Sequence, residues 1–150
     1  VHAQGFAHND VCLENVLVRP GTAAGAARRL VLTDFGSAER LGDVARSGRP
    51  AYFPPERLFG RAWRSTSKGD VYAAGLVVAT VHMLARPYTV PIRACGRPPF
   101  KNVDDVQRNV EDVLRRVPAY DKQRLWGMLL VDADQRYSAE EALGCQPVRW

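Results

Sequence analysis

The stretches HNDVCLEN at residues 8–15 and DFG at residues 34–36 decide how this sequence is interpreted. A short apolar run follows the first stretch at residues 16–18, and another precedes the second at residues 30–33. The Gly-, Ala-, Pro- and Thr-rich residues 20–27 between the two runs favour a loop. Two short apolar runs joined by a loop predict a small two-stranded β-ribbon.

The remainder of the chain has the pattern of helices. Residues 70–85 are apolar on nearly all sides, which predicts a buried central helix. Helical spacing of apolar residues predicts two further helices, marked by Val103, Val106, Val110, Val113 and Leu114, and then by Leu125, Met128 and Leu129. Residues 138–141, SAEE, form a capping box that begins another helix. Residues 37–55 show little periodicity and predict an irregular surface segment. We therefore expect an α+β fold that is predominantly α-helical.

Composition excludes several functional classes. The chain has 150 residues, 46% hydrophobic and 25% charged, which predicts one globular domain or part of one. No apolar run approaches the roughly 18–20 residues of a membrane-spanning helix, so we expect no membrane partner. The formal net charge is +5, but no basic patch with interleaved aromatic residues is present. We therefore do not expect nucleic-acid binding.

The cysteines and the first residue bear on the setting of the chain. Cys12, Cys95 and Cys145 are widely separated and form no ligand cluster with histidines. An odd number of distant cysteines argues against a disulfide framework, so we expect a reducing intracellular compartment. The chain begins with Val1 without a visible secretory signal, and its first residues have the character of a domain interior. We expect it to be a fragment of a longer protein.

Six stretches, taken together and in order, resemble the signature motifs of protein kinases. The two opening stretches are similar to H-R-D-L-x-x-x-N and D-F-G. The others are similar to G-T-x-x-Y-x-A-P-E at residues 48–56, to S-D-V-W-S-x-G at residues 68–75, to D-P-x-x-R at residues 132–136, and to the S/T-A-x-E-A-L helix that follows. The resemblance covers essentially all 150 residues. It implies that residues 1–150 form the C-terminal lobe of a kinase domain whose N-terminal lobe is absent from this chain.

The resemblance implies a chemistry for three side chains. Asp10 would accept the proton of a substrate hydroxyl, while Asn15 and Asp34 would hold Mg²⁺ against the phosphates of ATP. Oxygen ligands suit this hard cation. The implied function is transfer of the ATP γ-phosphate to Ser/Thr hydroxyls of protein substrates, because the tyrosine-kinase Ala-Ala-Arg sequence before Asn15 is absent. Without the N-terminal lobe, this chain alone should bind ATP poorly and transfer nothing measurable.

Other matched positions have structural roles in the family, and they are His8, Phe35, Gly36, Glu56, Asp70 and Arg136. By resemblance, Glu56 and Arg136 form a buried ion pair. Asp70 receives backbone N–H groups of the 8–15 loop, and His8 stacks with Phe35. The glycine of the D-F-G motif gives the following loop its freedom to move.

Three departures from the family pattern concern the site itself. Asn9 replaces the Arg of H-R-D, which usually reads a phosphate on the activation loop. Cys12 replaces the Lys that steadies the transferring phosphate, and Arg49 replaces the Thr that bonds this Lys. Because both partners have changed together, we hypothesise that Arg49 reaches into the site and supplies the missing positive charge. The alternative is that Arg49 points to solvent.

Two broader alternatives remain open. The loss of the Lys and the Thr is typical of a pseudokinase that acts as a protein-binding scaffold, whereas retention of all three oxygen-bearing residues argues for catalysis. The Arg- and Ala-rich composition and the His-Asn-Asp variant are similar to the herpesvirus protein kinases, which would imply a viral protein of the virion or host nucleus. The basic residues Arg57, Arg61, Arg64 and Lys68 predict either a solvated face or a site for acidic substrate segments.

Overall fold

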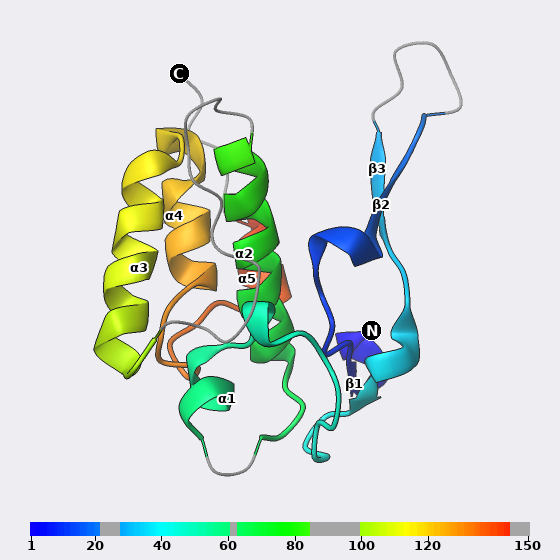
Figure 1. Cartoon of the computed structure of the whole chain (residues 1–150). Helices are drawn as coiled ribbons and strands as arrows, with labels where there is room; N and C mark the ends of the chain where they lie inside the picture. Colours follow the sequence, from blue (N-terminus) through cyan, green and yellow to red (C-terminus); the bar gives the residue numbers. More distant parts are fainter. Residues whose placement is uncertain (22–27, 61–62, 85–99, 145–150) are drawn as a thin grey trace.

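A computed structural model describes residues 1–21, 28–60, 63–84 and 100–144. Two parts are visible in Figure 1: short strands formed by the first 40 residues, and a group of helices formed by the rest. The helices are α1 (Pro55–Phe59), α2 (Ser67–Leu84), α3 (Val103–Arg116), α4 (Ala119–Met128) and α5 (Ala139–Gly144). The α+β, predominantly helical fold predicted from the sequence is thus confirmed.

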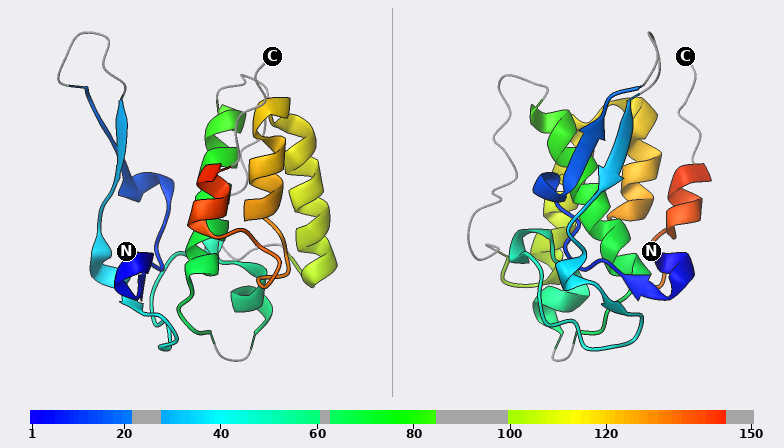
Figure 2. Two further views of the ribbon diagram at one scale, coloured as in Figure 1. Left: turned by 180° about the vertical axis from the view of Figure 1, so that it is seen from behind. Right: turned by 90° about the vertical axis from the view of Figure 1, so that its right-hand side faces the viewer.

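The predicted β-ribbon is present. Strand β2 (Val16–Arg19) pairs antiparallel with β3 (Arg29–Leu32), and Val16 lies opposite Leu32. Figures 1 and 2 show the ribbon to one side of the helices. The register brings residues 15 and 33 side by side at the end of the ribbon, so the two motifs that flank it become neighbours.

A second strand pair was not predicted. Strand β1 (Phe6–Ala7) pairs with β4 (Glu39–Arg40), and the 8–15 loop and the ribbon lie between these two strands in the sequence. Two-residue strands are too short to show an alternating pattern, so only a contact between distant segments defines them. This pair closes the base of the segment that contains the site.

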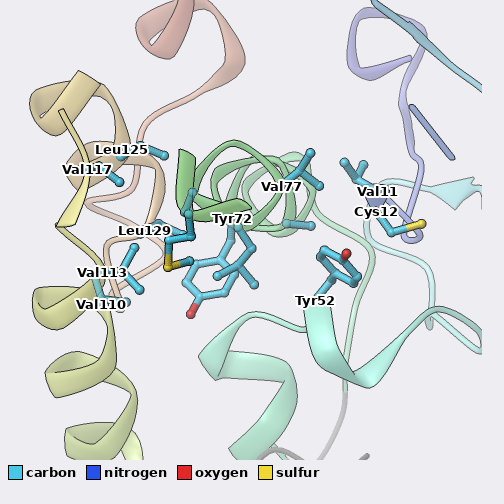
Figure 3. Packing of buried hydrophobic residues seen from close by; sticks show 14 of the residues in the cluster. Val11, Cys12, Tyr52, Tyr72, Val77, Val110, Val113, Val117, Leu125 and Leu129 are labelled. Carbon is cyan, nitrogen blue, oxygen red and sulfur yellow. The ribbon is translucent and has the colours of Figure 1, made fainter. Parts of the chain in front are cut away.

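Helix α2 is the centre of the core. Figure 3 shows Val77 of this helix facing Val11 and Cys12, while Leu125 and Leu129 lie on its other side. The helix begins at residue 67, three residues before the predicted start. The prediction of a fully buried helix is wrong at Val81, whose side chain is exposed because it faces away from these two layers.

The remaining helices follow their sequence patterns closely. Val106, Val110 and Val113 of α3 are buried, as their spacing predicted. At the start of α5, Ser138 N donates to Glu141 Oε2 at 2.6 Å, and Glu141 N donates to Ser138 Oγ at 3.1 Å. The capping box is confirmed with both of its reciprocal bonds.

The prediction of an irregular surface segment at residues 37–55 is only partly right. Besides β4, the segment contains a 3₁₀ turn, Pro50–Tyr52, and Tyr52, Pro54 and Pro55 are buried. This burial could not be predicted from the sequence, because a proline-rich segment has no periodic pattern of apolar residues. In the fold, its apolar side chains pack beneath the 8–15 loop. Tyr52 accordingly contacts the same core cluster as Val11 and Cys12.

The basic residues near α1 do not form one solvated face, so that interpretation is corrected. The guanidinium of Arg57 lies 3.5 Å from the centre of the Phe53 ring, and Lys68 Nζ donates to the carbonyl of Arg136. Arg64 donates to Gly42 O at 2.7 Å. The three side chains lie on different elements and have separate partners, because the helical spacing from which a common face was inferred crosses a break between α1 and α2.

Four predicted features lie outside the described residues: Arg61, Cys95, Cys145 and residues 22–27 of the predicted loop. No helix in the described ranges is long and apolar enough to cross a membrane.

Candidate active site

The 8–15 loop is anchored to the first turn of α2. The carboxylate of Asp70 accepts hydrogen bonds from His8 N at 2.6 Å and from Asn9 N at 2.8 Å. His2 Nε2 lies 2.9 Å from the same carboxylate. Asp70 therefore receives the backbone of the loop, as the sequence resemblance implied, and a buried carboxylate with these three partners is well satisfied.

Asn9 holds the loop to two other segments. Its backbone has φ 62°, in the left-handed region that Asn tolerates better than most residues. Its side-chain Nδ2 donates to Ser37 O at 3.1 Å and to Ser65 Oγ at 3.0 Å. A neutral amide thus ties the loop to the residues after the D-F-G motif and to the segment before α2.

His8 and Phe35 connect the two motifs through their rings. The ring centres lie 4.8 Å apart with an interplanar angle of 64°, an edge-to-face contact rather than a parallel stack. His8 Nδ1 accepts from Asp10 N at 3.3 Å, so Nε2 carries the proton that bonds Thr33 O at 3.0 Å. The buried imidazole is therefore a neutral positioning group for Asp10.

Asp10 and Asn15 are brought into direct contact. Asn15 Nδ2 donates to Asp10 O and to Asp10 Oδ2, each at 2.9 Å. The other carboxylate oxygen, Asp10 Oδ1, is buried and has no hydrogen-bond donor. A buried acceptor without a donor is unusual in proteins and identifies an oxygen that is poised for a further partner.

The ribbon register holds Asp34 beside this pair. Thr33 N and Thr33 Oγ1 donate to Asn15 O at 2.9 and 3.1 Å, and Asp34 follows directly. Asp34 has φ 60°, and its Oδ1 accepts from Gly36 N at 3.2 Å. The left-handed residue of the D-F-G motif is therefore the aspartate, and the freedom that Gly36 gives the following loop stays a prediction.

Arg49 lies against the 8–15 loop, while 39% of its side chain remains exposed to solvent. Its Nη1 lies 2.9 Å from Glu14 Oε2, and its Nε lies 3.5 Å from Asp10 Oδ1. The sequence did not single out Glu14; its position in the loop beside Asn15 was the one signal that could have found it. The backbone of Gly48 brings the neighbouring Arg49 close to the 8–15 loop. It has φ 130°, and a Cβ on this glycine would lie 2.4 Å from Asn9 O, so its backbone packs directly on the loop.

Cys12 supplies no charge at the site. The side chain is fully buried in the core cluster, and burial raises the pKa of its thiol. A raised pKa keeps the group neutral near pH 7, so the thiol is not activated. In this environment Cys12 is an inert residue of the core.

Glu56 and Arg136 form the buried ion pair expected from the sequence. Arg136 Nη1 and Nη2 lie 2.8 and 2.9 Å from the two carboxylate oxygens of Glu56. The Arg136 side chain is 0% exposed. The pair joins the start of α1 to the segment before α5 and so fixes these two parts of the helical region to each other.

The donors available to a metal are two oxygens. In the described part of the chain, neither Asn15 Oδ1 nor Asp34 Oδ2 takes part in a hydrogen bond. No group of three or more His, Cys, Asp or Glu side chains in the described ranges could enclose a metal. Two hard oxygens suit Mg²⁺, which proteins often bind through one or two side chains together with substrate phosphates.

Comparison with known proteins agrees with this geometry. The protein kinase domain family model matches residues 1–146. A serine/threonine-protein kinase of Drosophila melanogaster is 29% identical over 157 residues, which covers 95% of this chain and 19% of the relative. One of Drosophila erecta is 33% identical over 116 residues, which covers 76% of this chain and 14% of the relative. Glycogen synthase kinase 1 of Pyricularia oryzae is 37% identical over 91 residues, which covers 58% of this chain and 21% of the relative. The chain thus corresponds to a minor part of the length of each relative.

Proposed function

The chain belongs to the protein kinase domain family, and from this premise we propose that residues 1–150 form the C-terminal lobe of an ATP-dependent protein serine/threonine kinase. The observation that carries the proposal is the state of Asp10. Asn15 fixes one of its carboxylate oxygens, and the other is buried without a donor. A carboxylate held in this way is prepared to accept one hydrogen bond from a substrate hydroxyl.

The proposed reaction uses positioning more than covalent chemistry. A Ser or Thr hydroxyl of a protein substrate donates its hydrogen bond to Asp10 Oδ1, which directs the oxygen toward the γ-phosphorus of ATP. A bond forms between that oxygen and the γ-phosphorus, and the bond from the γ-phosphorus to the β–γ bridging oxygen breaks. ADP leaves, and the hydroxyl proton passes to Asp10 Oδ1.

Asn15 and Asp34 are the residues that would hold Mg²⁺ in this site. When bound, the ion neutralises phosphate charge. Within the chain itself, the His8 hydrogen bond to Asp10 N and the Asp70 hydrogen bonds to His8 N and Asn9 N fix the direction of the loop backbone. The nucleotide would also need the N-terminal lobe, which we place in the longer, intracellular protein to which this chain belongs.

A phosphorylation assay tests the proposal. Full-length protein with Mg²⁺ and ATP should phosphorylate Ser or Thr residues of a general protein substrate, and Asp10→Asn should abolish transfer while nucleotide binding remains. Asp104→Asn, an exposed position at the start of α3, is the matched control and should behave as the wild type.

A scaffold without catalysis is the second candidate, favoured by Cys12 and Arg49 at the positions of the family's Lys and Thr. Its mark would be a wild-type protein that transfers no phosphate under conditions where it binds Mg²⁺ and ATP. Equal transfer by wild type and Asp10→Asn would contradict the proposed role of Asp10.

A further inference from the structure

In the part of the chain that the structure describes, Arg49 and Arg57 both interact electrostatically with Asp10, and Arg49 forms the ion pair with it. The thiol at position 12 is buried and neutral. Lys68 donates to a backbone carbonyl of another segment, and the Arg57 guanidinium covers the Phe53 ring and bonds Ser47 O. Of the basic residues that the structure describes, Arg49 is the one with an ion pair to Asp10.

The position of Arg49 suits contact with the phosphoryl group. An attacking hydroxyl oxygen lies about 2.6–3.2 Å from the carboxylate oxygen that orients it, and the phosphorus lies roughly 3–3.5 Å beyond the oxygen. Arg49 Nε is 3.5 Å from that same carboxylate oxygen, Asp10 Oδ1. The phosphorus would thus lie within about 7 Å of Asp10 Oδ1, and the Arg49 guanidinium already lies beside that same atom, so this long side chain can reach the phosphoryl group.

Glu14 determines the position of the Arg49 guanidinium relative to Asp10. Its carboxylate lies 2.9 Å from Nη1, whereas Arg49 Nε lies 3.5 Å from Asp10. Without Glu14, the guanidinium would be free to form a close pair with Asp10 and to cover the oxygen that must receive the substrate proton. Glu14 thus holds Arg49 near Asp10 without allowing the two to close. The Arg49 side chain remains 39% exposed, so its guanidinium can also take a phosphate oxygen as a further acceptor.

We propose that Arg49 is the phosphate-binding cation of this kinase and that Glu14 is its positioning residue. This inference rests on the proposed function. Position 12 provides no positive charge, and the proposal assigns that charge to Arg49, in the segment after the D-F-G motif. Arg is well suited to the task because its planar fork binds phosphate through two parallel N–H groups.

The first test measures binding, independently of turnover. In the full-length protein, the affinity for Mg²⁺ with a non-hydrolysable ATP analogue is compared with the affinity for Mg²⁺ with ADP. Arg49→Met should remove the added affinity contributed by the γ-phosphate, and Arg49→Lys should retain part of it. Arg46→Met is the matched control, because Arg46 is exposed on the same segment and forms no ion pair in the described ranges. An unchanged affinity ratio in Arg49→Met would overturn the proposal.

The second test measures turnover. Arg49→Met should lower kcat by about 10²- to 10³-fold, the typical loss when one preorganised electrostatic contact is removed. Glu14→Gln should lower kcat by roughly 10-fold. It should also reduce the added affinity contributed by the γ-phosphate, because Glu14 then no longer fixes the position of the Arg49 guanidinium. A kcat for Arg49→Met within about twofold of Arg46→Met, with a raised KM for the peptide, would instead make Arg49 a substrate-recognition residue.

The two proposals fail in different ways. A wild-type protein that transfers no phosphate and binds no Mg²⁺-nucleotide refutes the proposed function. A wild-type protein that transfers phosphate, beside an Arg49→Met variant of unchanged kcat and unchanged affinity ratio, refutes the role of Arg49 alone. Thermal unfolding of each variant separates a loss of charge from a loss of fold, and the charge-retaining Arg49→Lys variant provides a second comparison.

Discussion

The buried pair between Arg136 and Glu56 gives the sharpest prediction about stability. All five N–H groups of the Arg136 guanidinium have acceptors: both carboxylate oxygens of Glu56 and the carbonyls of Lys68, Leu130 and Val131. Substituting Arg136→Met therefore leaves the partly buried carboxylate of Glu56, which is 29% exposed, and three carbonyls without their donor. Breaking a buried pair in this way costs about 3–5 kcal/mol, a large share of the roughly 5–15 kcal/mol that stabilises a typical domain.

Urea unfolding of the full-length protein, followed by circular dichroism, measures this loss. In a thermal scan, at roughly 2–4 °C per kcal/mol for a domain of this size, the melting temperature should fall by about 6–20 °C. Arg115→Met is the control, because Arg115 is 73% exposed and its pairing to Glu111 spans 4.0 Å. We expect this control to change stability by less than about 0.5 kcal/mol.

A double-mutant cycle with Glu56→Gln separates the pair from its surroundings. The double variant no longer contains an uncompensated charge, so its destabilisation should be smaller than the sum of the single effects by roughly 1–3 kcal/mol. Additive single effects, or a loss below about 1 kcal/mol for Arg136→Met, would refute the reasoning that this pair holds α1 to the helical base.

Local geometry supports four further predictions. Gly48→Ala should lower kcat at least about tenfold and destabilise the fold by roughly 1–3 kcal/mol, since its Cβ would meet Asn9 O at 2.4 Å; unchanged kinetics would contradict the close packing. Ser138→Ala should cost about 1 kcal/mol. The hydrogen bond from Ser138 N lowers the pKa of Glu141 and so stabilises the fold while Glu141 is ionised. Glu141→Gln should therefore destabilise the protein at pH 7, and this difference from the wild type should vanish as the pH falls through the lowered pKa. Unfolding of both proteins at pH 7 and pH 3 will check this. Cys12 should resist iodoacetamide in the native protein at pH 7 and react after unfolding, as peptide mass spectrometry will measure; rapid native labelling would contradict its burial.

The narrower resemblance to the herpesvirus protein kinases remains a prediction. The relatives described above come from flies and a fungus and match the general features of the family.

Much of the fold could be predicted because its signals are local. The spacing of valines in α3, the capping box of α5 and the two runs of the ribbon each depend on residues only a few positions apart. The β1–β4 pair and the burial of Tyr52 could not be predicted, since each depends on contacts between segments more than 30 residues apart.

The sequence by itself determined which chemical groups the site contains: the carboxylates of Asp10 and Asp34, the amide of Asn15, and the exchange of a lysine for Cys12. Only the tertiary structure decided what these groups face. The free oxygen of Asp10 and the pairing of Arg49 with Glu14 both depend on Gly48 packing against the carbonyl of Asn9. The direction of a long, flexible side chain is set by such distant contacts, and no local pattern in the chain records them.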